Sequence, residues 1–339
     1  MSSDVNSETS QTEALLAARS RPEFGSWWDY IDSRNRTSQD GEASTQGAMP
    51  ISSSAFVMHA MSLLHAPMLD VDVVSHCNLN CASCCHFAPI ASSAFLLPED
   101  FERDLRKLAR VEGIATYLRG INLMGGEPLL HPRLPELVRA TRRCLPEVQL
   151  SVTTNGLLVK AMGPEFWNAM RSTDCRLVFS RYPTGQDYEP LMEFAQARGV
   201  SVGTSGGSAE GGVISHFLRT PLDEEGRQDR TASFNRCPLG GYCMQLLDGK
   251  IFPCNRGALL SIVNERFGTA FAHEKDDYLE LDAIRSVEDI DAMRRRSHPM
   301  CRYCATQLDE RIAWRRSAAE RDEWLMRPDE RQLVTQTGK

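Results

Sequence analysis

The repeated pairing of a short apolar segment with an amphipathic one constrains the fold of this chain more than any other feature. Residues 68–74, MLDVDVV, alternate and are β-branched, which predicts a strand. In the next segment Phe101, Leu105 and Leu108 fall on one helical stripe that follows Pro98, which predicts a helix. The same order recurs along the chain, with strands expected at 120–124, 148–154, 175–180 and 200–205 and helices at 133–145, 164–170 and 188–198.

Strands that alternate with helices form a parallel sheet covered by the helices, and five such units predict a curved sheet. The expected fold is therefore α/β, with a partial (β/α)6-type barrel. In such folds the chemistry gathers in the loops that leave the carboxyl ends of the strands. A loop dense in cysteine and the sequences GGEP, TTNG and SRYP all fall at that end.

Composition narrows the function classes and the compartment. A formal net charge of −7 offers no basic surface for neutralising phosphates, so nucleic acid is not expected as a partner. The sequence shows neither a secretory signal nor an apolar run that spans a membrane, so we expect a cytoplasmic protein with no membrane partner. The 11 cysteines, an odd number in a reducing compartment, point to metal or redox chemistry rather than to disulfides.

The chain is expected to divide into four parts: a mostly disordered arm (1–55), the barrel (68–215), a smaller unit (232–310) and a C-terminal helix and tail (311–339). The arm is rich in Ser, Thr, Gln and Asn, and its aromatic patch of Trp27, Trp28 and Tyr30 is expected to dock on the body or on a partner.

Two local patterns mark the later parts of the chain. In the smaller unit, apolar runs flank Asp248 and Gly249, which predicts a β-hairpin. The Arg/Glu-rich segment that follows predicts a solvated helix anchored by Ile312, Trp314 and Leu325.

The densest motif is the loop after the first strand, in which Cys77, Cys81 and Cys84 have the spacing C-x3-C-x2-C. Three thiolates leave one iron of a four-iron cluster without a protein ligand and open to an exogenous chelator. A structural zinc site would want a fourth ligand, which His76 or His86 would supply, so zinc is the alternative.

This loop, opening with CNLNC, resembles the radical S-adenosylmethionine (radical SAM) superfamily, and the resemblance covers roughly residues 68–305. The sequence GGEP, Gly125, Gly126, Glu127 and Pro128, follows the second strand, where that family places backbone groups that hold the methionine amino group of SAM. Alone, GGEP is a weak signal because it also suits a plain turn. Together with the cysteine loop it favours the cluster over zinc.

The resemblance implies a mechanism and a set of contacts. A [4Fe–4S] cluster binds SAM at its open iron, an electron cleaves SAM to methionine and a 5′-deoxyadenosyl radical, and that radical takes a hydrogen atom from the substrate. A reductant such as flavodoxin or ferredoxin is implied as a partner. Asn155 and Ser180 stand where family members contact the SAM carboxylate and ribose, although a turn residue or strand cap suits each position equally.

A second set of cysteines lies in the smaller unit. A hairpin and a distant C-x2-C would close one metal site completely, as in a zinc ribbon. The set also resembles the SPASM/twitch extensions of radical SAM enzymes, and because no cysteine follows Cys304 it fits the shorter twitch version with one auxiliary [4Fe–4S] cluster. The expected ligands are Cys237, Cys254, Cys301 and Cys304, with Cys243 as an alternative to Cys237. Such a cluster would relay electrons, or only stabilise the unit.

The function expected from these features is a radical SAM oxidoreductase, of dehydrogenase or epimerase type. Its substrate is expected to be a polar small molecule, sugar-like or nucleotide-linked. A maturase of a ribosomally made peptide and a non-catalytic metal-binding interaction module are the alternatives. Cys85, Tyr182 and Glu210 are candidates for a base or hydrogen donor by position only, and no role is assigned to Arg181.

Overall fold

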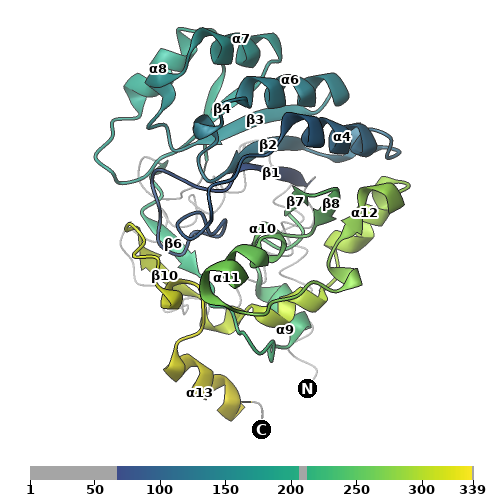
Figure 1. The fold of residues 1–339 in the computed structure, drawn as a ribbon, viewed down its shortest axis with the longest axis vertical. Helices are drawn as coiled ribbons and strands as arrows, with labels where there is room; N and C mark the ends of the chain where they lie inside the picture. The colour runs from purple at the N-terminus through teal and green to yellow at the C-terminus, as the bar shows by residue number, and fades with distance from the viewer. Residues whose placement is uncertain (1–66, 206–211, 338–339) are drawn as a thin grey trace, which may run out of the picture.

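The computed structural model describes residues 67–205 and 212–337 (Figure 1). The predicted arm at 1–55 and Glu210 lie outside the described residues, so the expectations for them stay predictions. Within the described residues, no helix is long and apolar enough to cross a membrane.

One sheet of eight strands organises the described chain, in the order β5-β4-β3-β2-β1-β7-β8-β9. The strands from β5 to β1 and β7 run parallel, as the repeated units predict. The bounds are β1 Met68–Val74, β2 Gly120–Gly125, β3 Gln149–Thr154, β4 Arg176–Ser180, β5 Val202–Ser205, β7 Cys243–Leu247, β8 Lys250–Phe252 and β9 Leu279–Glu280. The α/β prediction of a partial parallel barrel is thereby confirmed.

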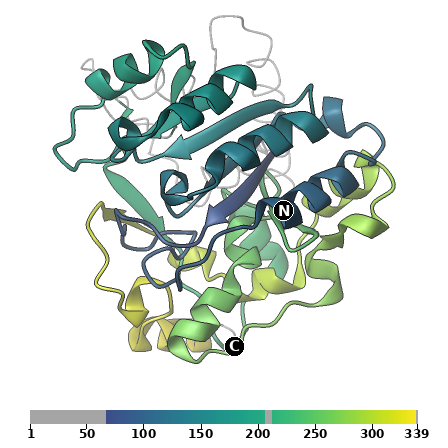
Figure 2. The same ribbon diagram turned by 45° about the horizontal axis from the view of Figure 1, so that its top comes forward.

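Helices cover one face of this sheet (Figures 1 and 2). Leu69, Val71 and Val73 of β1 join the same buried apolar cluster as Leu105 and Leu137 of the helices. Because side chains alternate across a strand, the residues between them point to the opposite face. The helices are α4 Pro98–Leu108, α5 Ile114–Tyr117, α6 Leu134–Cys144, α7 Pro164–Ser172 and α8 Glu189–Gln196, with 3₁₀ turns η1 Pro128–Leu130 and η2 Val159–Ala161.

The predicted hairpin is present and extends the main sheet. β7 and β8 pair antiparallel around Asp248 (φ 48°) and Gly249 (φ 72°), the left-handed pair that a tight hairpin turn needs. β7 also pairs with β1, placing the hairpin at the edge of the barrel.

The remaining elements form a second layer, which adds Leu281, Ile290 and Met293 to the first apolar cluster and surrounds another cluster that includes Phe252, Val263 and Trp324. They are β6 His216–Arg219, α9 Arg230–Arg236, α10 Asn255–Ala258, α11 Leu260–Phe267, η4 Lys275–Asp277, η5 Leu281–Ala283, α12 Val287–Arg294, η6 Pro299–Tyr303, η7 Thr306–Leu308, β10 Glu310–Ala313, η8 Arg321–Glu323 and α13 Pro328–Thr337.

The predicted Arg/Glu-rich helix after residue 311 is wrong over most of its length. Residues 310–313 form β10, which pairs antiparallel with β6, and α13 begins only at Pro328. Between them the chain runs beside the cysteine loop and hydrogen-bonds to its backbone, for example through the N–H of Ser317 and the carbonyl of Asn80 (2.7 Å). Tertiary hydrogen bonds therefore override a helical composition.

Candidate active site

The cysteine loop leaves the carboxyl end of β1. The pKa of the Cys81 thiol is raised to about 12, chiefly by burial and then by the neighbouring Cys84 and Cys77, because a second or third negative charge nearby is unfavourable; the hydrogen bond from Trp314 opposes this rise. All three predicted ligands therefore lie within electrostatic reach of one another. Asn80 (φ 53°) and Ser83 (φ 54°) take the left-handed conformations that fold the loop so tightly.

The GGEP turn packs directly against the start of this loop. The N–H of Glu127 donates to the carbonyl of His76 (3.0 Å), next to the first cysteine. A Cβ on Gly126 would lie 1.9 Å from that carbonyl oxygen, and Gly125 has φ +113°. Two glycines are thus required here by close backbone approach.

The Glu127 side chain is buried and forms hydrogen bonds with residues at the end of β3. Its carboxylate accepts hydrogen bonds from the Thr154 hydroxyl (2.7 Å) and the Leu129 N–H (3.0 Å). It also accepts one from the N–H of Asn155 (2.8 Å). The Asn155 side-chain amide in turn donates to Asn78 Oδ1 (2.7 Å) and lies 3.7 Å from the Cys77 sulfur. The structure therefore brings GGEP, TTNG and the cysteine loop together.

Ser180 is the last residue of β4, and Tyr182 follows it near the thiols of the cysteine loop. The Ser180 hydroxyl is 2.6 Å from that of Ser205. Burial, and then the thiols of the cysteine loop, raise the pKa of Tyr182 well above its ordinary value. The structure therefore places this phenol beside the cysteine loop, and its suggested role as a base or hydrogen donor stays a prediction.

Cys85 and His86 turn toward the second layer. His86 Nδ1 lies 3.0 Å from the Asp72 carboxylate, and Nε2 lies 3.0 Å from the amide nitrogen of Asn255. That amide nitrogen is also 3.4 Å from the Cys85 sulfur. Burial opposes ionisation of Cys85, but His86 outweighs it and lowers the thiol pKa. With both ring nitrogens engaged, His86 is a poor fourth ligand for zinc.

The second set of cysteines encloses one cavity, lined by the four predicted ligands Cys237, Cys254, Cys301 and Cys304 together with apolar side chains, Arg256 and a few polar side chains. Burial raises the pKa of Cys254 well above its ordinary value, and the other three thiols raise it further. Cys243 lies instead on β7, where burial and then the nearby Asp70 carboxyl raise the pKa of its thiol. This placement favours Cys237 over Cys243.

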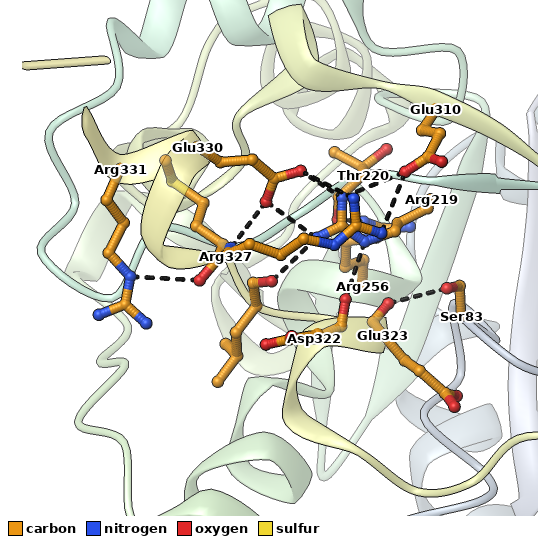
Figure 3. Close-up of polar contacts among 12 residues, drawn as sticks. Ser83, Arg219, Thr220, Arg256, Glu310, Asp322, Glu323, Arg327, Glu330 and Arg331 are labelled. Atoms are coloured by element: carbon orange, nitrogen blue, oxygen red, sulfur yellow. Dashed lines mark hydrogen bonds and ion pairs between the residues drawn. The ribbon is translucent and has the colours of Figure 1, made fainter. Parts of the chain in front are cut away.

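Residues 310–325, here called the C-terminal strap, contribute contacts that the sequence did not predict. The indole N–H of Trp314 donates to the Cys81 sulfur (3.2 Å), and that of Trp324 donates to the Cys84 carbonyl (3.0 Å). Ser83 donates to the carbonyl of Glu323 (2.8 Å; Figure 3). The one available signal was the two tryptophans, whose N–H groups need partners when buried.

The family comparison agrees with this geometry. Residues 71–180 match the family model described as the radical SAM superfamily. That segment is a radical SAM domain. It begins in β1 and ends with β4, so it contains the cysteine loop, GGEP, Asn155 and Ser180.

Curated relatives share this part of the chain. The GTP 3′,8-cyclase of Helicobacter pylori is 35% identical over 101 residues, which cover 29% of this chain and 30% of the relative. The GTP 3′,8-cyclase of Nostoc punctiforme is 35% identical over 114 residues, covering 30% and 31%. The chain therefore matches less than a third of the length of these relatives.

Solved radical SAM structures are also similar to this chain. BtrN in complex with AdoMet and 2-DOIA aligns with a TM-score of 0.39 at 12% identity, over 71% of this chain and 93% of that one. Streptococcus suis SuiB bound to precursor peptide SuiA aligns with a TM-score of 0.34 at 12% identity, over 88% and 82%.

Proposed function

We propose that the protein is a radical SAM enzyme whose Cys77, Cys81 and Cys84 hold a [4Fe–4S] cluster with SAM at its open iron. The observation that carries the proposal is the convergence of these three thiols at the carboxyl end of β1, against the Gly125-Gly126 turn. When bound, the cluster and SAM supply a 5′-deoxyadenosyl radical that takes a hydrogen atom from the substrate. Reduced flavodoxin or ferredoxin would deliver the electron.

The chain's own residues would hold and orient SAM. Gly125 and Gly126 let the turn pack closely against Val74 and His76 at the start of the cysteine loop. The N–H groups of Gly126 and Glu127 are bonded there, so we assign backbone carbonyl groups of the turn to the methionine amino group. Glu127 fixes this turn to the end of β3 through Asn155. Asn155 and Ser180 flank the cysteine loop, and we assign them polar contacts to the SAM carboxylate and ribose.

We assign the second cavity to one auxiliary iron–sulfur cluster. Four buried thiols lining one cavity supply full cysteine ligation. Full ligation suits electron relay rather than substrate binding.

The face of the sheet turned away from the helices favours a hydroxyl-bearing substrate. Asn122 accepts hydrogen bonds there from Ser151 (3.0 Å) and Thr153 (2.7 Å) and donates to Asp70 (3.1 Å). Short polar groups that donate and accept are suited to alcohol groups of a sugar-like molecule. We therefore propose a polar small molecule, oxidised or epimerised, as the substrate.

The same strands carry few cationic side chains that could bind a phosphate group. β1 to β5 and β7 carry no lysine and one arginine, Arg176, whose guanidinium donates to the Val202 carbonyl (3.1 Å). A triphosphate is bound by several such cations. The strands themselves thus supply a single arginine, which is already bonded, for the triphosphate of a molecule such as GTP, the substrate printed in the names of the curated relatives.

Anaerobic reconstitution followed by 5′-deoxyadenosine analysis tests the proposal. Wild type should cleave SAM when reduced, and a panel of deuterated aminocyclitols and sugars should transfer deuterium to 5′-deoxyadenosine. Transfer from a peptide instead would make the protein a maturase. If the protein binds zinc and does not cleave SAM, the remaining interpretation is a non-catalytic metal-binding module.

A further inference from the structure

The C-terminal strap covers the cysteine loop along its backbone. The carbonyl of Arg315 accepts from the N–H of Ala82 (3.0 Å). Arg316 reaches the carbonyl of Leu79 (3.1 Å) from the same side. These contacts join segments more than 230 residues apart in sequence, so the loop is completed by a distant part of the chain.

A buried arginine, Arg219, forms hydrogen bonds with the backbone of the strap (Figure 3). Arg219 is 2% exposed, and its guanidinium donates to the carbonyls of Asp322 (2.9 Å) and Leu325 (3.1 Å). Glu330 of α13 pairs with the same guanidinium through both oxygens (2.7 and 3.0 Å). The strap is therefore fixed over the loop rather than loosely laid across it.

One strap residue reaches a sulfur atom directly. The indole Nε1 of Trp314 lies 3.2 Å from the Cys81 sulfur. This contact is shorter than those to the Cys77 sulfur from the Leu79 N–H (3.4 Å) and the Asn155 amide (3.7 Å). An indole nitrogen is only a donor, so the direction of the hydrogen bond is fixed.

We propose that Trp314 is a positioning residue that sets the reduction potential of the cluster on the cysteine loop by donating a hydrogen bond to the Cys81 sulfur. This inference rests on the proposed cluster at that loop. One-electron reduction by flavodoxin or dithionite takes the [4Fe–4S] core from the 2+ to the 1+ state and adds negative charge to the sulfurs. A donor to a sulfur stabilises that charge and raises the potential.

Trp314→Phe removes the N–H and keeps an aromatic ring beside Tyr182, whose ring centroid is 6.3 Å away. We expect the midpoint potential of the SAM-binding cluster, followed by EPR in a potentiometric titration, to shift to a more negative value at unchanged iron content. A variant with 3-benzothienylalanine at position 314, which keeps the size of tryptophan but lacks the N–H, should show the same shift.

Trp324→Phe is the matched control. It removes an indole N–H that also reaches the cysteine loop, but at the Cys84 carbonyl instead of a sulfur (3.0 Å). Its potential should stay close to that of wild type.

The outcomes separate this inference from the function it rests on. A wild type without a reducible cluster at the cysteine loop overturns the proposed function. A wild-type cluster whose potential is the same in Trp314→Phe overturns the role of Trp314 alone. If the benzothienyl variant restores the wild-type potential, packing and not the hydrogen bond sets it, and the inference is wrong.

Discussion

The carboxylate of Glu127 accepts a 2.8 Å hydrogen bond from the backbone N–H of Asn155, and this contact ties the end of β2 to the end of β3. The N–H of Glu127 also donates to the carbonyl of His76. The Glu127–Asn155 contact therefore positions both the GGEP turn and the TTNG turn beside the cysteine loop. Glu127 thus stabilises the proposed SAM site by fixing the positions of the loops that form it.

Burial raises the pKa of Glu127 to about 7, although three hydrogen bonds partly oppose the rise. The folded protein therefore holds this proton more tightly than the unfolded chain. The resulting stabilisation is complete below about pH 4.5 and is lost as the pH rises to about 7. Glu127→Gln does not titrate, so the unfolding free energy of wild type relative to this variant should fall by about 3 kcal/mol across that range.

Urea denaturation of the metal-free protein at several pH values measures this difference. Gln196→Ala, at an exposed position on α8, changes no ionisable group and is the control, so its difference from wild type should stay constant with pH. A wild-type stability that rises relative to Glu127→Gln across the range would show that the carboxylate is not the titrating group.

Gly126→Ala should prevent iron uptake at the cysteine loop. The added Cβ would lie 1.9 Å from the carbonyl oxygen of His76, so the turn and the start of the loop must separate. Gly163→Ala is the control, because nothing lies within 4 Å of the Cβ it adds. At that helix N-cap the cost should be about 1 kcal/mol or less. Normal iron content and SAM binding in Gly126→Ala would show that the close approach is not needed.

Arg219→Met should destabilise the protein by about 3–5 kcal/mol, because it leaves the Glu330 carboxylate without its buried partner. It also releases the carbonyls of Asp322 and Leu325 in the strap. Arg311→Met, at an exposed position on the neighbouring strand, should change stability by less than about 0.5 kcal/mol. Equal effects of the two variants, measured by chemical denaturation, would mean that the ion pair does not anchor the strap.

Cys237→Ala should lose the iron of the auxiliary site, whereas Cys243→Ala should retain it. Cys237 lines the cavity with the other three thiols, and Cys243 lies on β7 beside Asp70. Iron and sulfide analysis of both variants, in a background lacking Cys77, Cys81 and Cys84, isolates the second site. The reverse pattern would make Cys243 the ligand.

Much of the fold follows from local patterns in the sequence. The strand MLDVDVV matches β1 residue for residue, and Asp248-Gly249 forms the expected hairpin turn. These predictions succeed because apolar alternation and left-handed turn residues act within a few positions. The motifs at the strand ends also meet as expected, since the carboxyl ends of parallel strands lie at one edge of a sheet.

The contacts of the C-terminal strap could not be predicted in this way. Its Arg- and Glu-rich composition favours a helix, and only pairing with β6 and with the cysteine loop keeps the segment extended. Trp314 meets Cys81 across a separation of 233 residues, and local periodicity carries no information about such a contact. The engagement of both ring nitrogens of His86 is equally a property of the assembled fold.

Anaerobic iron content and SAM cleavage, measured on wild type and on a variant with Cys77, Cys81 and Cys84 changed to Ala, test whether the cysteine loop holds a SAM-cleaving cluster. We expect about eight irons and reductive formation of 5′-deoxyadenosine by wild type, and about four irons with no cleavage by the variant. A wild type that binds zinc and leaves SAM intact under reduction would contradict this expectation.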